Sequence, residues 1–438
     1  MTSIYQYIEK NQSVSLLDKP LTEVDLLILN ELVYFPIEQL NFTPAESLAG
    51  IRLEDFFTLI DPFLSQMKEN WVLASNDRIK ILKKVTQAER YRDIKLLAFE
   101  SEIERIDEYQ FAALSLRLPN QTVMISYRGT DDSLVGWKED CNMSFQSQIP
   151  SQGLAADYLA RMFTLVAGDG DAKLVISGHS KGGNLAIYAA AVQEPLVQDA
   201  IELIFSFDGP GFHQATLDEV AYQRIQHKIR HYVPEDSIVG MMLLHSQAPI
   251  VVKSKGMAFS HHIVTKWYID GDQLQRIERR SDLSYLIDAS LKEWAIDRSE
   301  EELASIFNES FNIIYQTGVQ SLVDISQNPL QFSRLFLNHL HTLEPELKTF
   351  LDDNLGSFFD ILRSHLVEQR RDHYQETATN ISQWLKELSL TPKLPVDSSL
   401  LQKIKQHFQN NQTIPLTPPV TAAADELMDK MVEDESLG

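Results

Sequence analysis

The sequence predicts an α/β protein with a mainly parallel central sheet, helices on both of its faces, and further helical regions at each end of the chain. The first observation is that the apolar spacing changes from a helical to a strand period at about residue 94. Between residues 120 and 256, strand-like and helical segments then alternate, which is typical of a parallel sheet covered on both faces. After Trp267 the helical spacing returns.

These changes of period divide the chain into four predicted regions. Residues 1–90 are expected to form an N-terminal helical segment packed on the core, and residues 91–270 form the α/β core itself. Residues 271–410 are expected to form a helical C-terminal region, in which Ser299 and Glu302 have the spacing of a capping box. Residues 411–438 begin with closely spaced prolines and end with acidic residues, and we expect an extended acidic tail.

The elements of the core are predicted from their apolar period. Strand-like runs are expected at Lys95–Glu100, Phe111–Arg117, Thr122–Tyr127, Leu174–Ile176, Ile201–Phe207, Lys228–Val233 and Pro249–Ser254. Helical spacing is expected at Glu23–Tyr34, Ile79–Val85, Leu154–Val166 and Asn184–Val192.

Composition narrows the classes of partner and compartment. Of the 438 residues, 44% are apolar, which is enough for a substantial core. A net charge of -23 disfavours binding to phosphate backbones, so nucleic acid is not an expected partner. The single cysteine, Cys141, excludes an internal disulfide and fits a reducing compartment. No secretory signal or transmembrane run is recognisable, and we expect a cytoplasmic protein of unknown oligomeric state.

The most specific motif is Gly178-His-Ser180-Lys-Gly182, between a predicted strand and a predicted helix. In a Gly-x-Ser-x-Gly turn of this kind, the serine lies at a sharp strand-to-helix corner with its hydroxyl exposed. The glycines on either side remove Cβ atoms that would clash at the corner. The helix that follows directs its first N–H groups toward a developing oxyanion. Ser180 is therefore predicted to be a nucleophile.

A second motif, Arg128-Gly-Thr130, directly follows the strand that ends at Tyr127. In serine hydrolases of this architecture, the loop after an early strand supplies one oxyanion donor, and the residue after the nucleophile supplies the other. We therefore expect the backbone N–H groups of Thr130 and Lys181 to form the oxyanion hole, with help from the Thr130 hydroxyl. Taken alone, the same motif reads as a turn capping the helix that begins near Ser133.

Candidates for the acid and the base follow the serine in the order that these hydrolases use. Asp236 comes after the strand Lys228–Val233, and His262 comes after the next strand. An aspartate in this position orients the imidazole, and the histidine takes the proton of the serine. Two alternatives stay open: Asp208, which ends the strand Ile201–Phe207 but also begins a strong turn sequence, and His261, the neighbour of His262.

The motifs resemble those of lipase class 3 proteins and, more closely, those of the bacterial Mbeg1-like family, a domain of unknown function in the α/β-hydrolase superfamily. The segments that carry the resemblance are Glu23–Leu29, Arg128–Asp132, Trp137–Asp140, Ser177–Ala186, Asp208–Phe212 and Asp236–Met241. The resemblance implies an α/β-hydrolase core over residues 91–270, with Ser180, Asp236 and His262 in the triad positions. Lys181 departs from the lipase pattern, in which an apolar residue is usual at this position.

Two functions of different class fit these features. The first is a serine hydrolase that cleaves a carboxylic ester, with a lipid or small-molecule ester as substrate. The second is a catalytically silent scaffold of the same fold that binds a ligand or a partner protein. No cysteine or carboxylate cluster has the spacing of metal ligands, so neither a metal nor a cofactor is expected. For the side chain of Lys181, an ion pair with Asp131 or Asp132 and a contact with a polar head group stay open.

Overall fold

The computed structural model describes residues 2–40, 50–64, 75–168, 173–256, 258–321, 324–325 and 328–368. The predicted tail, residues 411–438, and the end of the predicted C-terminal helical region, residues 369–410, lie outside the described residues.

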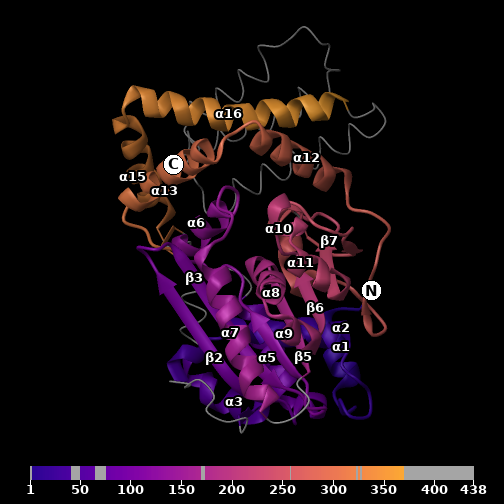
Figure 1. Cartoon of the computed structure of the whole chain (residues 1–438). Coiled ribbons are helices and arrows are strands. Elements are labelled where there is room, and N and C mark those ends of the chain that lie inside the picture. The colour runs from indigo at the N-terminus through magenta and orange to yellow at the C-terminus, as the bar shows by residue number, and fades with distance from the viewer. Residues whose placement is uncertain are drawn as a thin grey trace.

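An eight-stranded sheet forms the centre of the molecule, and its strands lie side by side in the order in which they occur along the chain (Figure 1). The strands from β1 to β4 are antiparallel to one another, and those from β4 to β8 are parallel. Their bounds are β1 Ile51–Arg52, β2 Lys95–Glu104, β3 Tyr109–Arg117, β4 Val123–Tyr127, β5 Leu174–His179, β6 Ile201–Phe207, β7 Ile229–Pro234 and β8 Ile250–Val252. The predicted fold class, a mainly parallel sheet with helices on both faces, is confirmed.

One face of the sheet is covered by the helices that connect its parallel strands. α7 (Pro150–Ala167), α8 (Lys181–Ala191) and α11 (Val220–Ile225) follow β4, β5 and β6. Because neighbouring strands follow in chain order and parallel crossovers are right-handed, these helices must lie on the same face. Their apolar side chains share one core cluster with alternate strand residues such as Ile125 and Ile176. The shorter helices on this side of the chain are α6 Leu134–Asn142, α9 Pro195–Ala200 and α10 Gln214–Asp218.

The opposite face is covered by the N-terminal segment, because the crossover helices leave it bare. A second core cluster joins this segment to the other set of strand residues, including Met124, Val175 and Phe205. Inside it, Arg90 and Asp25 form an ion pair of 2.5 Å whose side chains are both fully buried. The elements of the segment are α1 Ile4–Asn11, α2 Glu23–Asn30, η1 Glu31–Tyr34, η2 Ile37–Leu40, α3 Leu53–Ile60, η3 Asp61–Phe63, α5 Ser75–Gln87 and η4 Glu89–Tyr91.

Short elements precede, join and follow the last two strands of the sheet. These are the 3-10 helices η5 Gln226–Lys228, η6 Val239–Met241, η7 Ala258–His262 and η8 Val264–Lys266, and the two-stranded sheet of β9 Ile269–Asp270 and β10 Gln273–Leu274. β9 and β10 pair antiparallel. η7 and η8 hold the segment that carries both predicted histidines.

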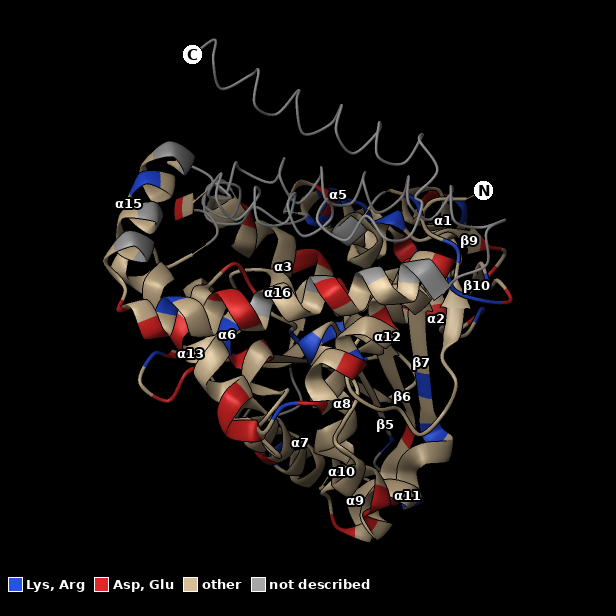
Figure 2. Cartoon of the chain, turned by 90° about the horizontal axis from the view of Figure 1, so that it is seen from above, with Lys and Arg blue, Asp and Glu red and all other residues tan. Residues whose placement is uncertain are grey.

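The C-terminal helices lie beyond the end of the sheet at which α6 is found (Figure 1). They are α12 Asp282–Ile296, α13 Glu300–Gln316, α15 Pro329–Thr342 and α16 Pro345–Glu368. Ser299 caps α13 with the predicted capping box. On one side, Phe307 of α13 stacks on Phe145, and on the other the Ser284 hydroxyl of α12 donates to the carbonyl of Ser237. Acidic residues lie on α13 and α16 in the view from above (Figure 2).

Candidate active site

Ser180 stands at the corner between β5 and α8, as predicted for a nucleophile elbow. Its backbone has φ 58° and ψ -136°, a region that side-chain-bearing residues rarely occupy. The corner is fixed on both sides: the N–H of Ser180 donates to the carbonyl of Phe207 at 2.9 Å, and its own carbonyl accepts from Gly183 N at 2.8 Å. The strained corner therefore belongs to the hydrogen-bonded framework of β5, β6 and α8.

The two glycines of the elbow are required by close backbone approaches. A Cβ at Gly178 would lie 1.9 Å from the carbonyl oxygen of Gly182. A Cβ at Gly182 would lie 2.2 Å from the carbonyl oxygen of Tyr127, at the end of β4. These separations are far below any van der Waals contact, so only glycine allows α8 to start this close to β4 and β5.

The loop after β4 lies against the elbow. A Cβ at Gly129 would lie 2.9 Å from the Cβ of Ser180, which places the Arg128–Thr130 loop directly beside the serine. The hydroxyl of Thr130 donates to Oδ2 of Asp140, in the last turn of α6, at 2.5 Å. The predicted oxyanion residues Thr130 and Lys181 thus flank the serine, one in the adjacent loop and one at the start of α8.

Asp140 is a buried carboxyl in this corner to which the sequence alone assigned no role. Burial raises the pKa of Asp140 to about 6, although Lys181 and the hydrogen bond from Thr130 act in the opposite direction. Its Oδ1 has no hydrogen-bond partner among the described residues. The spacing of Trp137 and Asp140 was noted as part of a family motif, but only the fold brings the carboxyl to the Thr130 hydroxyl.

His262 pairs with Asp208. Nδ1 of His262 lies 2.6 Å from Oδ2 of Asp208, whose side chain is fully buried. The His262 ring lies 4.5 Å from the ring of His179, the residue before Ser180, so the imidazole stands beside the elbow. With Nδ1 held by the carboxylate, Nε2 is the ring nitrogen left to exchange a proton.

The predicted pairing of Asp236 with His262 is not found, and this is a correction. Oδ2 of Asp236 lies 3.1 Å from Nε2 of His261, which also contacts the carbonyl of Gly256 at 2.9 Å. Nδ1 of His261 is bound to the hydroxyl of Ser254 at 2.7 Å. Adjacent histidines point in different directions, so Asp236 and His261 fasten the loop after β8 while His262 turns to Asp208.

The segment after β7 supports Asp208 with residues other than Asp236. Oδ1 of Asp208 accepts hydrogen bonds from the Ser237 hydroxyl at 2.5 Å and from the N–H of Gly240 at 3.1 Å. A Cβ at Gly240 would lie 2.2 Å from that same oxygen. The Asp236–Met241 motif therefore holds the carboxylate through its serine and its glycine, and both oxygens of Asp208 are engaged.

Lys181 points into the interior. Its side chain is 1% exposed, and Nζ lies 2.5 Å from Oε2 of Glu139 and 2.8 Å from the carbonyl of Gln110. Glu139 also accepts backbone hydrogen bonds from Gln110 and Ser151, both at 3.1 Å. Neither alternative left open for this lysine is found, since it contacts neither Asp131, Asp132 nor the outside of the protein. It locks α8 to α6 and β3 behind the serine.

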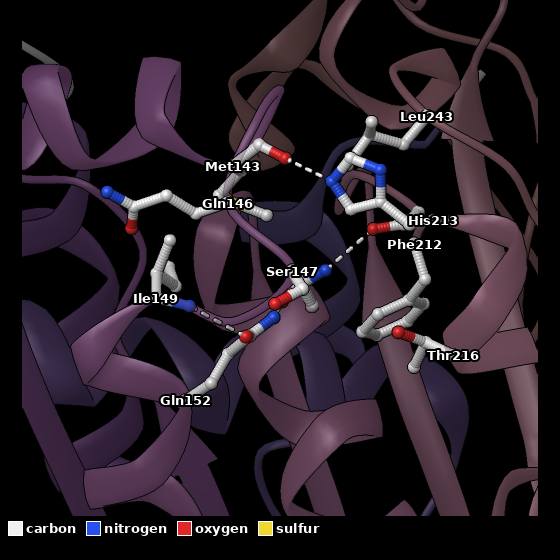
Figure 3. A pocket seen from close by; sticks show the side chains of 11 residues that line it. Met143, Gln146, Ser147, Ile149, Gln152, Phe212, His213, Thr216 and Leu243 are labelled. Carbon is white, nitrogen blue, oxygen red and sulfur yellow. Dashed lines mark hydrogen bonds between the residues drawn. The ribbon is translucent and has the colours of Figure 1, made fainter. Parts of the chain in front are cut away.

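A small cavity lies on the α7 side of the elbow helix (Figure 3). Its volume is about 10 Å³, enough for roughly one water molecule. His213 crosses its upper end, where Nε2 contacts the carbonyl of Met143 at 2.9 Å. In this conformation the cavity does not accommodate an acyl chain.

Within the described ranges, no group of three or more histidine, cysteine, aspartate or glutamate side chains could hold a metal ion. Among the helices described by the structure, none has the length and apolar character needed to cross a bilayer.

Known proteins similar to this chain include two fungal lipase structures. Lipase II from Rhizopus niveus is 15% identical, with a TM-score of 0.30, and the match covers 45% of this chain and 82% of the lipase. A fungal lipase–inhibitor complex, described as a model for interfacial activation in lipases, is also 15% identical, with a TM-score of 0.33 and coverage of 60% and 92%. None of the curated proteins matches the chain. Residues 85–312, more than half of the chain, match the Mbeg1-like family, and the chain belongs to that family.

Proposed function

We propose that the protein is a serine hydrolase that cleaves carboxylic esters through an acyl-enzyme on Ser180. The observation that carries the proposal is the pairing of His262 with the buried Asp208 beside a strained serine elbow, with Nδ1 and Oδ2 2.6 Å apart. Strain of this kind costs about 1–3 kcal/mol and persists where the surrounding structure enforces it, commonly at functional sites. A loop with no chemical role needs neither the strained serine nor a buried carboxylate behind a histidine.

In the first half of the reaction, Nε2 of His262 takes the proton of Ser180, and the serine oxygen forms a bond to the carbonyl carbon of the ester. Asp208 stabilises the imidazolium that results and keeps Nδ1 protonated, without taking the proton itself. The imidazolium then gives its proton to the alcohol oxygen as the carbon–oxygen bond of the ester breaks. A water molecule, deprotonated by the same nitrogen, attacks the acyl-enzyme. The imidazolium then returns this proton to the oxygen of Ser180 as the acyl–oxygen bond breaks, which releases the carboxylic acid and restores the serine.

The negative charge that develops on the carbonyl oxygen needs donors that are already in place. We assign this role to the backbone N–H groups of Thr130 and Lys181, which flank the serine. The hydrogen bond from the Thr130 hydroxyl to Asp140 supports this assignment because it fixes the loop that carries the first donor. The Lys181–Glu139 pair supports it because it fixes the first turn of α8, which carries the second.

The substrate class is proposed as a small-molecule or lipid ester. The interior position of Lys181 removes the head-group contact that its sequence position left open. The net charge of -23 disfavours substrates presented on strongly anionic surfaces. The same chemistry can cleave thioesters and amides, so a substrate screen should include these classes as well as acyl esters.

The test is covalent labelling of the purified protein with a fluorophosphonate probe, which forms a stable bond with an activated serine. Labelling is expected in the wild type, absent in Ser180→Ala, and slowed in His262→Ala. Ser177→Ala is the matched control: Ser177 lies on β5 three residues before the elbow and is fully buried, so its loss should leave labelling intact. A folded wild-type protein that does not label contradicts the proposal and favours a silent binding scaffold of the same fold.

A further inference from the structure

A tyrosine of the N-terminal segment, Tyr34, contacts the candidate site. Tyr34, the last residue of η1, accepts a hydrogen bond from the N–H of Gly129 at 3.0 Å. Its hydroxyl also lies 3.2 Å from Nδ1 of His179. Nε2 of His179 lies 2.8 Å from the backbone carbonyl of His262. A chain of hydrogen bonds therefore runs from the oxyanion loop to the residue that bears the proposed base.

The donor and the acceptor in each of these hydrogen bonds can be assigned, because the series begins at a backbone N–H and ends at a backbone carbonyl. A carbonyl oxygen can only accept, so Nε2 of His179 carries the proton that is donated to His262. Nδ1 of the neutral ring is then an acceptor, and the Tyr34 hydroxyl donates to it while accepting from Gly129. Burial lowers the pKa of His179 well below its usual value, with nearby His262 acting in the same sense, which keeps the ring neutral.

The tyrosine itself is held in a fixed position. Its side chain is 2% exposed, and burial raises the pKa of its hydroxyl, so it remains a donor. The guanidinium of Arg78 lies over the ring at 3.8 Å from the centroid. Arg78 is in turn held by Glu31, with Nε 2.8 Å from Oε2, and both side chains are nearly fully buried. The ring is therefore held in place by residues of η1 and α5, both of which belong to the N-terminal segment.

We propose that Tyr34 is a positioning residue for the reaction: it sets the oxyanion loop relative to the base by joining Gly129 to His179 and, through it, to His262. The inference rests on the proposed function. Gly129 immediately precedes Thr130, so a shift of its N–H moves the oxyanion donor. Tyr34 lies outside the residues that match the family, 85–312, so the N-terminal segment completes a site whose reacting groups all lie within that range.

The experiment compares Tyr34→Phe with Tyr158→Phe. The first variant keeps the ring under Arg78 and removes only the hydroxyl. The second removes an equally buried hydroxyl, bound to Ser115 at 2.8 Å on the other face of the sheet. Both are assayed on an activated ester and on the matching thionoester, whose sulfur depends much less on oxyanion donors. Thermal unfolding verifies that both variants are folded.

For Tyr34→Phe we expect kcat on the ester to fall about 10-fold with little change in KM, and the preference for ester over thionoester to fall by a similar factor. Tyr158→Phe should change neither quantity more than about twofold. Equal behaviour of the two variants, or equal losses on both substrates, overturns the positioning role while leaving the proposed function standing. If Tyr34→Phe does not fold, His179→Phe interrupts the same chain at its next member and gives the same comparison. A wild-type protein without Ser180-dependent hydrolysis overturns both proposals.

Discussion

Oδ2 of Asp208 and Nδ1 of His262 are 2.6 Å apart although 54 residues separate them in the chain. The carboxylate is fully buried and its second oxygen is saturated by Ser237 and Gly240. The contact with His262 is made by the other oxygen of this buried carboxylate. Such an arrangement orients an imidazole more strictly than an exposed aspartate, because neither group can rotate away without losing bonds.

This relationship predicts that replacing Asp208 lowers kcat strongly, whereas replacing Asp236 changes it little. Asp208→Asn preserves the size of the side chain but removes its charge. The imidazolium of His262 then loses its negative partner, and the neutral ring is no longer held in the required tautomer. We expect kcat for ester hydrolysis to fall on the order of 10³–10⁴-fold. Asp236→Asn, which affects only the His261 contact at 3.1 Å, should change kcat less than about threefold. Steady-state kinetics on one activated ester measures both.

The reverse ranking, with Asp236→Asn the more damaging, would show that the loop after β8 rearranges when substrate binds. Ser237→Ala separates the two cases further. It removes one hydrogen bond to Asp208 without touching Asp236, and we expect an intermediate loss of about 10-fold.

The elbow could be predicted from sequence because its determinants are local. Two glycines, a serine and the flanking apolar periods lie close together in the sequence. The clash that requires Gly178 is with the backbone of Gly182 in the same turn, although the clash that requires Gly182 is with Tyr127 on β4. The strands β2 to β8 were predicted for the same reason, and differ from the structure mainly at their ends, whereas the two-residue strands β1, β9 and β10 were not predicted. β8, for example, is Ile250–Val252 rather than the longer run Pro249–Ser254.

The acid could not be chosen in this way, because its partner is set by how two loops meet. Asp208 and Asp236 both follow a strand, and the turn sequence after Asp208 gave it an ordinary explanation. Only the fold shows that Gly240 leaves room for the carboxylate, with a hypothetical Cβ 2.2 Å from its oxygen. Glu139, the partner of Lys181, was missed for a similar reason, since α6 and α8 meet only through the packing of β3, β4 and β5.

The Asp140–Thr130 contact predicts an unusual pH dependence. Above a pH of about 6 the Asp140 carboxyl is ionised and holds the proton of the Thr130 hydroxyl. Below that pH the carboxyl is protonated, can donate to the hydroxyl oxygen, and leaves the hydroxyl proton for the oxyanion. The amide introduced by Asp140→Asn donates at every pH. The ratio of kcat for Asp140→Asn to that of the wild type should therefore rise several-fold, by about 3- to 10-fold, between pH 5 and pH 8.

The ratio compares two proteins in which Lys181 and Glu139 form the same buried ion pair. Stability gives a second readout with a definite sign. The folded-state pKa of Asp140 is raised above its usual 3.8, so its contribution to stability is present below about pH 4 and is lost as the pH rises through about 6. Asp140→Asn should thus gain stability over the wild type as the pH rises, as measured by urea unfolding. A kcat ratio that does not change with pH would contradict a role for the Thr130 hydroxyl in the oxyanion hole.

The Lys181–Glu139 pair predicts a large effect on stability. Lys181→Met leaves Glu139 buried at 0% exposure without a counter-charge, which costs about 3–5 kcal/mol in comparable pairs. The double variant Lys181→Met with Glu139→Gln removes both charges and should recover a substantial part of that loss. Lys138→Met is the matched control, because its partner Glu108 is 34% exposed and can be hydrated when left alone. Urea unfolding measures the free energy of unfolding of each variant. A small effect of Lys181→Met alone would contradict an ion pair that is shielded from solvent.

The backbone contact that brings α8 against β4 depends on the absence of a side chain at Gly182. Gly182→Ala would place a methyl group 2.2 Å from the carbonyl oxygen of Tyr127, where no rotamer can relieve the clash. We expect a loss of about 3 kcal/mol or more in unfolding free energy, together with loss of fluorophosphonate labelling, because the helix start must retreat from the oxyanion loop. Gly356→Ala, within α16, is the control: an added Cβ there meets no atom within 4 Å, and alanine favours the helix by about 0.5–1 kcal/mol. It should raise stability and leave labelling unchanged. Retained labelling in Gly182→Ala would mean that the serine can be activated with α8 displaced, and would argue against Lys181 N–H as an oxyanion donor.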